Sequence, residues 1–354
     1  MNFKIGTKNI SNDSPSYFIA DIASNHDGDL NRAKDLISLA REVGADGVKF
    51  QHFQADKIVS RQGFEKLGAQ LSHQGKWPKS VYEMYLDASI AREWTEELKK
   101  HCNHECIDFF SSPYDMEAIE HLDPYVSVYK VGSGDITWPE ILQAMAQKGK
   151  PMILSTGASD LIDVQRAVDV IYPINRQLAI LQCNTNYTGN KDNFKYVCLN
   201  VLKTYKRLYP EFVIGLSDHT PELTTVLGAI ALGARIIEKH FTDDNSRIGP
   251  DHAFSLNPTA WKEMVLRARE LELALGKSTK VVEENEKDTV VLQRRCLRAT
   301  AQLEPGDVIT RDKISVLRPA PAGAVMPYDM QKIIGLTIKR QMEAGEEFTW
   351  DLFK

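Results

Sequence analysis

The stretches Gly215-Leu216-Ser217-Asp218-His219 and Ile236-Ile237-Glu238-Lys239-His240 decide how the rest of the chain is interpreted. Each is a short apolar run that ends in a histidine, and a segment of helical character separates them. If the two runs are neighbouring parallel strands, both histidines lie at the carboxyl ends of strands, on one face of a sheet. Ligands and metals bind at that face in α/β folds.

The same alternation of short apolar runs and amphipathic segments extends over most of the chain, as expected for a parallel sheet covered by helices. It begins with a strand at 17–22, a helix from Leu30 to Ala40 and a second strand at 47–51. Six further strands are expected at 107–111, 127–131, 151–155, 178–183, 212–216 and 235–239. Eight βα units within about 270 residues favour a closed (β/α)8 TIM barrel over an open doubly wound sheet, and no dinucleotide-type glycine motif follows the first strand.

Two segments break this alternation. Residues 58–79 combine glycine, proline and polar residues with few periodic apolar positions, and we interpret them as a substrate lid, with a mobile surface loop as the alternative. After a barrel domain at 1–280 and a charged linker at 281–291, residues 292–354 form a small, mostly β domain. Its strands are expected at 297–301, 306–310, 314–319 and 345–349.

Composition excludes several classes of function. A net charge of -5 gives no basic footprint, so nucleic acid is not an expected partner. No apolar run approaches the roughly 20 residues of a membrane span, and the first residues lack the apolar core of a signal peptide, so we expect a cytoplasmic protein without a membrane segment. The five cysteines lack paired spacing, which favours reduced thiols over disulfides or structural zinc.

His219 and His240 are candidate metal ligands because neutral imidazole binds divalent transition metals. A single histidine is more often a hydrogen-bonded core residue, but two at equivalent strand ends favour a site. With two imidazoles and no nearby thiolate, the site would be open and would suit a Lewis-acid metal. Thr220-Pro221 predicts a helix that begins directly after His219, with Thr220 as its N-cap.

Lysines and small hydroxyl side chains recur at the same strand ends. Lys49 and Lys130 each end a strand, and the hydroxyl groups belong to Ser111, Ser112, Ser133, Ser155 and Ser217. Each serine alone is more often a helix N-cap, but their repetition beside two lysines indicates a site for an anionic substrate such as a phosphate-carboxylate. The candidates for proton transfer and hydroxyl recognition are Asp21, Asn25, His26, Glu238 and Asp251.

Together these motifs resemble the sialic acid synthase family, whose members condense phosphoenolpyruvate with an N-acylated hexosamine to make nonulosonic acids. The resemblance spans nearly the whole chain, and the tail resembles the family's antifreeze-like (SAF) domain. The matching motifs are SNHDGDL (24–30), GADGVKFQ (44–51), SSPYD (111–115), YKVGSGD (129–135), ILSTG (153–157), IGLSDHT (214–220), EKHFT (238–242) and GPDHAFSL (249–256).

The resemblance implies a role for each motif residue. It implies that His219 and His240 hold a divalent metal, Mn2+ first, with Mg2+ or Co2+ as alternatives. The residues implied to bind phosphoenolpyruvate are Lys49, Ser112, Lys130, Ser133, Ser155 and Ser217, and those implied to bind the sugar are Gln51, Tyr187, Asp251 and Arg318. Arg318 would reach the sugar's N-acyl group across a domain-swapped homodimer, and Asp21 and Glu238 are the implied catalytic carboxylates.

Two positions depart from the family pattern. Asp21 stands where the family has glutamate, which places the carboxylate about one methylene, roughly 1.5 Å, further back. The family's Thr-x-Tyr-Pro reads Thr185-Asn186-Tyr187-Thr188 here. The default acceptor is N-acetylmannosamine, giving N-acetylneuraminate, with legionaminic or pseudaminic acid synthase as alternatives and Trp77 and residues 82–85 as expected determinants. The residues are also compatible with a non-catalytic protein that binds a sugar or phosphosugar, and with aldol cleavage through a Schiff base on Lys130 or Lys49.

Overall fold

The computed structural model describes residues 2–68 and 72–354. The chain divides into two compact units, Met1–Gly276 and Lys277–Lys354. The first unit contains an eight-stranded sheet in the order β5-β4-β3-β10-β9-β8-β7-β6, in which all hydrogen-bonded neighbours are parallel. Strand β5 lies beside β6, so the sheet forms a nearly closed barrel, and the predicted fold is confirmed.

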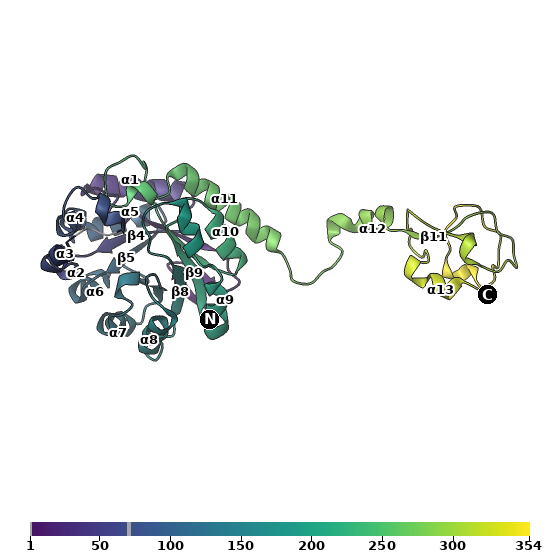
Figure 1. Ribbon diagram of the computed structural model, residues 1–354, viewed down its shortest axis with the longest axis horizontal. Helices are drawn as coiled ribbons and strands as arrows, with labels where there is room; N and C mark the ends of the chain where they lie inside the picture. Colours follow the sequence, from purple (N-terminus) through teal and green to yellow (C-terminus); the bar gives the residue numbers. More distant parts are fainter. Residues whose placement is uncertain (1, 69–71) are drawn as a thin grey trace. The chain divides into compact units, whose positions relative to one another are not determined.

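The barrel strands match the predicted runs within two residues at each end. They are β3 (Tyr17–Asp21), β4 (Gly47–His52), β5 (Asp108–Pro113), β6 (Tyr129–Val131), β7 (Met152–Ser155), β8 (Leu178–Cys183), β9 (Val213–Asp218) and β10 (Ile236–His240). The helices α1 (Leu30–Glu42), α5 (Trp94–His104), α6 (Met116–Leu122), α7 (Pro139–Gln147), α8 (Leu161–Ile171), α9 (Val201–Leu208), α10 (Thr224–Ala231) and α11 (Pro258–Leu275) surround the strands (Figure 1).

The inward-facing side of each strand changes from apolar to polar toward its carboxyl end. Side chains two residues apart share one face of a strand. Along β3 the inward positions are Tyr17, Ile19 and then Asp21, and along β10 they run from Ile236 through Glu238 to His240. The apolar members form a single buried cluster inside the barrel. The polar members therefore gather above that cluster, at the carboxyl-terminal rim.

An antiparallel hairpin that the sequence did not predict contributes to the amino-terminal half of this inner cluster. It consists of β1 (Asn2–Ile5) and β2 (Lys8–Ser11). Phe3, Ile5 and Ile10 are buried and join the barrel's inner cluster. The hairpin thus adds to the apolar filling beneath the polar rim.

The helix predicted directly after His219 begins later than expected, because α10 starts at Thr224. The Thr220 hydroxyl donates to Asp218 Oδ2 at 2.9 Å instead of capping a helix, and Lys239 Nζ donates to the Thr220 carbonyl at 2.7 Å. Lys239 also pairs with Asp218 at 2.5 Å, and both are buried. This outward-facing pair fixes the turn that follows His219.

The segment interpreted as a lid or mobile loop contains helices. Residues 58–79 include α3 (Arg61–Leu67) and the 3-10 helix η1 (Ser72–Lys76), while residues 69–71 lie outside the described ranges. The helices α2 (Ala55–Ile58) and α4 (Val81–Ala88) flank this segment. Ala55, Val59 and Val81 form a small apolar cluster with Ile58, Phe64, Trp77, Tyr82 and Tyr85 packed against it. We call the described residues of this segment together with its flanks, residues 53–68 and 72–88, the lid segment below.

The second unit has its own small core. Two of its four predicted strands are present, as the antiparallel pair β11 (Cys296–Ala299) and β12 (Ile314–Leu317). The expected strands at 306–310 and 345–349 are wrong, since only isolated bridges occur there, such as Val308 with Thr337. The helices η5 (Glu284–Glu286) and α12 (Lys287–Gln293) precede this sheet, and α13 (Met330–Ile333) follows it.

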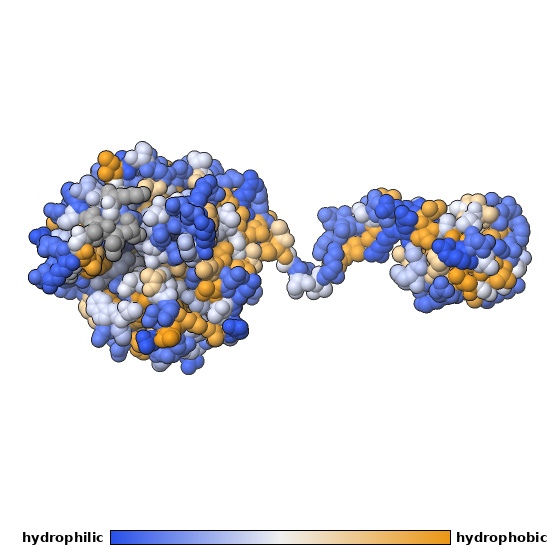
Figure 2. All heavy atoms as spheres, viewed as in Figure 1, coloured by the Kyte–Doolittle hydropathy of each residue, from blue (hydrophilic) through white to orange (hydrophobic). Residues whose placement is uncertain are grey.

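The outer surface is mostly hydrophilic. Figure 2 shows hydrophilic side chains over most of the visible surface of the barrel helices, with small hydrophobic areas between them. Within the described ranges, every helix is too short or too polar to cross a bilayer.

Candidate active site

Most of the site residues named from the sequence lie together at the carboxyl-terminal rim of the barrel. They occupy alternate, inward-facing positions on neighbouring strands, which follows from the two-residue period of a strand. The residues placed in this way are Asp21, Lys49, Gln51, Ser112, Lys130, Ser155, Ser217, Glu238 and His240, and His219 follows one residue after the end of β9. Ser133 begins the 3-10 helix η2 (Ser133–Asp135) after β6, and Tyr187 and Asp251 lie on loops at the same rim. Arg318 belongs to the second unit, where it is exposed and donates from Nε to the Gln293 carbonyl at 2.6 Å.

Four buried charges form the centre of the rim, and we call Asp21, Lys49, Lys130 and Glu238 the charged floor. Lys49 Nζ lies 2.6 Å from Asp21 Oδ2, and Lys130 Nζ lies 3.4 Å from Glu238 Oε1. All four side chains are buried. A buried charge is costly unless it is paired. The two cations and two anions of the floor therefore compensate one another before any ligand binds.

The charged groups of the floor shift one another's pKa values. Burial lowers the pKa of Lys49, but Asp21 and Glu238 outweigh burial, and the pKa lies above its ordinary value. For Lys130 burial prevails over Glu238, and the pKa lies below its ordinary value. Burial raises the pKa of Glu238, yet Lys130 and Lys49 outweigh it and hold that pKa below its usual value. Lys49 and Glu238 are therefore charged at neutral pH.

Unsatisfied hydroxyl and carboxylate atoms surround the floor. The buried atoms Ser112 Oγ, Ser155 Oγ and Glu238 Oε2 have no hydrogen-bond partner among the described residues. Buried polar atoms in native proteins are nearly always paired, so unpaired ones beside two lysines mark a place for ligand atoms. Two other hydroxyls have partners, since Ser217 donates to Glu238 at 3.0 Å and Ser133 accepts from the Gly157 amide at 3.0 Å.

Of the two rim histidines, His219 has the orienting hydrogen bond typical of a metal ligand, whereas His240 has a buried ring nitrogen without a partner among the described residues. His219 Nδ1 lies 2.8 Å from the Asn184 carbonyl, which can only accept, so Nδ1 carries the proton and Nε2 keeps its lone pair. Burial, and then His240, lower the pKa of His219 to about 3, which keeps the ring neutral. His240 Nδ1 is buried without a partner among the described residues, and the ring centroids are 5.4 Å apart.

This donor set fits an open metal site with two protein ligands. The rings are close enough for one ion to contact a nitrogen of each. In the described parts of the chain, no three side chains of His, Cys, Asp or Glu converge closely enough to hold a metal. Further ligands would therefore be water or substrate oxygen, as expected for a Lewis-acid site and not for a closed structural one.

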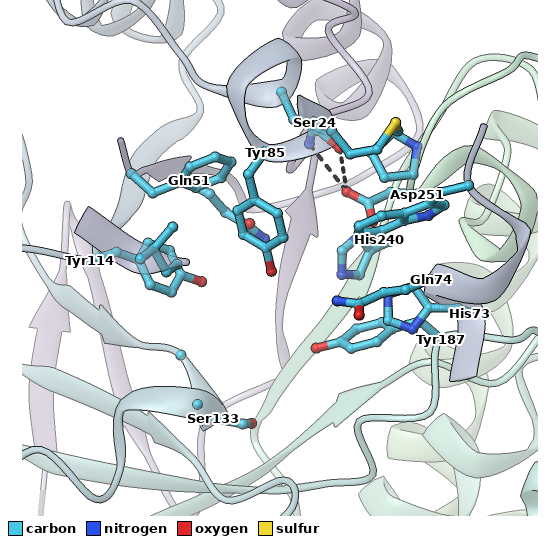
Figure 3. A pocket seen from close by; sticks show the side chains of 18 of the residues that line it. Ser24, Gln51, His73, Gln74, Tyr85, Tyr114, Ser133, Tyr187, His240 and Asp251 are labelled. Atoms are coloured by element: carbon cyan, nitrogen blue, oxygen red, sulfur yellow. Dashed lines mark hydrogen bonds between the residues drawn. The ribbon is translucent and has the colours of Figure 1, made fainter. Parts of the chain in front are cut away.

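Above the floor lies a cavity of about 410 Å³, which we call the chamber. Figure 3 shows the hydroxyls of Tyr85 and Tyr114 directed into it from one side, opposite His240 and Tyr187. The Tyr187 ring contacts the His219 ring edge-on, with centroids 4.4 Å apart. Asp251 also lines the chamber, and its Oδ2 accepts a hydrogen bond from the Ser24 hydroxyl at 2.6 Å (Figure 3).

Asp21 is held firmly despite its short side chain. Its Oδ1 accepts from the Ala23 amide at 3.0 Å, while Oδ2 faces Lys49 and lies 3.5 Å from His240 Nε2. Gln51 Nε2 donates to the same oxygen at 3.4 Å. The carboxylate therefore sits between the floor lysine and the metal-type histidine, where a water molecule bound by either could reach it.

Some chamber residues were missed in the sequence. Tyr114 continues the inward series of Phe110 and Ser112, so the two-residue period alone would have found it. His73 and Gln74 come from η1, and no pattern in the sequence marks them. Conversely, Asn25 does not line the chamber, since its side chain donates to the Phe241 carbonyl at 2.9 Å.

The fold and the rim define a (β/α)8 barrel protein with buried charged groups at the carboxyl ends of its strands, and comparison with known proteins identifies its family. The model of the NeuB family matches residues 36–280, and that of the SAF domain matches residues 294–354. The chain belongs to the NeuB family, which confirms the resemblance to sialic acid synthases, and its tail is a SAF domain.

Three relatives illustrate the range of named activities. N,N'-diacetyllegionaminic acid synthase of Legionella pneumophila is 34% identical over 343 residues, covering 95% of this chain and 94% of that protein. N-acetylneuraminate-9-phosphate synthase of Homo sapiens is 31% identical, covering 94% of this chain and 90% of that protein. The crystal structure of N-acetylneuraminic acid synthetase from Leptospira borgpetersenii, in complex with citrate, has a TM-score of 0.72 at 27% identity, covering 82% of this chain and 95% of that one.

Proposed function

We propose that the protein is a nonulosonic acid synthase that condenses phosphoenolpyruvate with the open-chain form of an N-acyl hexosamine and releases phosphate. The observation that carries this proposal is the charged floor. It combines two buried lysines with unpartnered hydroxyls at the carboxyl-terminal rim, beneath a chamber of about 410 Å³. The names of the legionaminic and neuraminate synthases among the relatives support the same reaction class.

In this proposal the floor binds phosphoenolpyruvate. Lys49 and Lys130 neutralise its phosphate and carboxylate, and Ser112 and Ser155 donate hydrogen bonds from hydroxyls that have no described partner. A polyanion competes with Asp21 and Glu238 for the lysines, so substrate binding loosens the two ion pairs. The carboxylate of Asp21 then becomes available as a base.

The reaction joins C3 of phosphoenolpyruvate to the aldehyde carbon of the sugar, whose oxygen takes up a proton. Water adds to C2, Asp21 accepts a proton from that water, and phosphate leaves as the C2–O bond breaks. His219 and His240 would hold a divalent metal, which would polarise the aldehyde. Tyr187 and Asp251 line the chamber and orient the sugar in this proposal.

Phosphate release tests the proposal directly. Purified protein is incubated with phosphoenolpyruvate, Mn2+ and a panel of N-acyl hexosamines, with N-acetylmannosamine as the default. We expect phosphate release that depends on the acceptor. Tight sugar binding without turnover of any acceptor would contradict the enzyme and favour a non-catalytic binding protein. Borohydride trapping of a substrate on Lys130 or Lys49 would favour Schiff-base chemistry instead.

Metal removal gives a second prediction. Chelation with EDTA should reduce phosphate release to background, and added Mn2+ should restore it. The same assay with Mg2+ and with Co2+ ranks the three metals by the rate of phosphate release that each restores. His219→Ala should lower Mn2+ affinity, measured by calorimetry, about 10- to 100-fold or more, because one of two protein ligands is lost. The matched control is His104→Ala, whose side chain is 82% exposed. Full activity in EDTA would contradict the metal site.

A further inference from the structure

The chamber continues outward into a second cavity of about 580 Å³, which we call the outer chamber. Both cavities are lined by Ser24, His73, Trp77 and Tyr187. An acceptor whose aldehyde carbon meets phosphoenolpyruvate at the charged floor must direct its other end away from the floor. The substituent at that end is therefore what these two cavities recognise.

The described side chains that line the outer chamber carry no net charge. Arg247 Nη2 lies 2.7 Å from Asp27 Oδ2, and Lys79 Nζ lies 2.6 Å from Asp87 Oδ2, so the two cations and two carboxylates sum to zero. Exposed ion pairs of this kind are weak. The strength of either ion pair matters less here than the sum of the charges. Because that sum is zero, the cavity lacks the net positive charge expected of a phosphate site.

The chamber itself is slightly acidic. Counting only the side chains that the structure describes, in residues 2–68, 73–75 and 77–354, its lining contains no lysine or arginine, but it contains the carboxylates Asp135 and Asp251. Burial raises the pKa of Asp135 to about 6, which still leaves it mostly ionised at neutral pH. A phosphate monoester carries about -1.5 to -2 charges at pH 7 and would meet these carboxylates without a compensating cation.

One side of the chamber is apolar instead. Phe53, Ile58, Trp77, Met84 and Tyr85 come from the lid segment and line the cavity, and we call them the roof. Ile58, Trp77 and Tyr85 also pack on the lid segment's own apolar cluster, which holds them in place. Such a surface favours methyl groups and sugar carbons over charged groups.

We propose that the acceptor is an uncharged N-acyl amino sugar, not a sugar phosphate, and that the roof selects it by contact with apolar substituents such as a deoxy methyl or an acyl methyl group. This inference rests on the proposed function and narrows it to one substrate class. In the proposed function, the charged floor supplies two lysines to the phosphate and carboxylate of phosphoenolpyruvate. The chamber and outer chamber supply none that lacks a carboxylate partner among the described residues.

In this proposal, His73 makes a polar contact with the acceptor sugar. Its ring packs edge-on against Tyr187 and Trp77, with centroids 5.0 and 5.3 Å away. Its buried Nδ1 has no partner among the described residues, and the ring lies beside Gln74 in the chamber lining (Figure 3). Burial lowers the pKa of His73, so the ring is neutral and suits an amide or hydroxyl group.

The test compares three acceptors that differ only at the far end: N-acetylmannosamine, its 6-deoxy analogue and its 6-phosphate. With Mn2+ and saturating phosphoenolpyruvate, we expect kcat/KM for the 6-deoxy analogue to stay within about tenfold of the parent sugar, because a methyl group suits the roof. The 6-phosphate should be about 100-fold poorer or worse, because its charge is uncompensated.

A charge-introducing variant makes the test specific to the roof. Met84→Lys places a cation at the wall shared by the two cavities and should improve the 6-phosphate relative to the parent sugar about tenfold. Leu86→Lys is the matched control, because Leu86 lies on the same helix and is 57% exposed. If Met84→Lys does not fold, Ala88→Lys adds a cation to the same wall.

The outcomes separate the inference from the function it rests on. A 6-phosphate used as well as N-acetylmannosamine by the unmodified protein would overturn the inference and leave the synthase intact. An unchanged preference in both Met84→Lys and Ala88→Lys would also overturn it. Phosphate release that no acceptor stimulates would overturn the proposed function itself. The inference is supported if the unmodified protein prefers N-acetylmannosamine and its 6-deoxy analogue to the 6-phosphate, and if this preference changes in Met84→Lys or Ala88→Lys but not in Leu86→Lys.

Discussion

The charged floor and the roof lie in the same site and are built in opposite ways. The floor residues sit on four different barrel strands, and their charges are paired and buried. The roof residues come from the lid segment, carry no charge and rest partly on a small cluster of their own. In the proposed function, this difference attaches the chemistry to the rigid sheet and leaves selection of the acceptor to a segment that can vary without disturbing the barrel.

The largest effect is expected when one charge is removed from the floor. Lys49→Met leaves Asp21 buried without its 2.6 Å partner, which should lower the free energy of unfolding by about 3–5 kcal/mol. Loss of the cation should also reduce kcat/KM for phosphate release about 10²- to 10³-fold. Denaturant unfolding and steady-state kinetics measure the two effects separately.

A second variant distinguishes chemistry from stability. Lys49→Met combined with Asp21→Asn removes both charges and should regain most of the lost stability without regaining activity. At the roof, Ile58→Ala should reduce kcat/KM less than about tenfold, because it removes only an apolar contact. Equal losses at Lys49 and Ile58 would end the distinction between floor and roof.

The next effect concerns a buried histidine behind the floor. His52 Nδ1 lies 2.6 Å from Ser111 Oγ, and its Nε2 lies 2.8 Å from Thr95 Oγ1. Burial, and then His121, lower the pKa of His52 to about 3, whereas an unfolded histidine has a pKa near 6.5. The neutral ring therefore stabilises the fold fully above pH 6.5, and this contribution is lost as the pH falls from 6.5 toward 3.

At pH 5 the expected loss is about 2 kcal/mol from His52 alone, relative to neutral pH. Denaturant unfolding between pH 7 and pH 4 measures it. His52→Gln should be less stable at pH 7 but should lose less stability on acidification, whereas His104→Gln, at an exposed position, should follow the unmodified protein. An identical pH slope in His52→Gln would show that this histidine is not the acid-sensitive group.

The floor could be predicted from the sequence because its residues obey a local rule. Inward positions on parallel strands alternate, and polar residues at the carboxyl ends of strands converge at one rim. Lys49, Lys130 and Glu238 each occupy such a position, so recognising the strands was sufficient to bring them together. Tyr114 follows the same rule and was overlooked only because it lies one residue beyond β5.

The roof was predicted only in part, because the family resemblance singled out Trp77 and residues 82–85 as determinants of the acceptor but did not indicate the contact of the neighbouring His73 with Tyr187. His73 lies on a short 3-10 helix whose packing against Tyr187 joins segments more than 100 residues apart, and no period in the sequence encodes such a contact. The prediction of a helix directly after His219 was wrong for a related reason. Thr220 has the local signature of an N-cap, but Asp218 and Lys239 hold its hydroxyl and carbonyl, and those contacts override local preference.

The smallest expected effect concerns Arg318, which would extend the comparison to a third source of site residues. The family resemblance implies that this arginine acts on a partner's barrel. If it does, a mixture of Arg318→Ala and His219→Ala chains contains heterodimers in which one barrel has both an intact histidine and an intact arginine from its partner. Equal amounts of randomly assorted chains should then recover about one quarter of the unmodified activity, because half of the dimers have one complete site of two.

The chains are mixed by reversible unfolding or co-expression, and heterodimers are verified by differential tags before phosphate release is measured. Verified heterodimers no more active than their parents would place Arg318 outside the partner's chamber, leaving floor and roof as the two parts of the site.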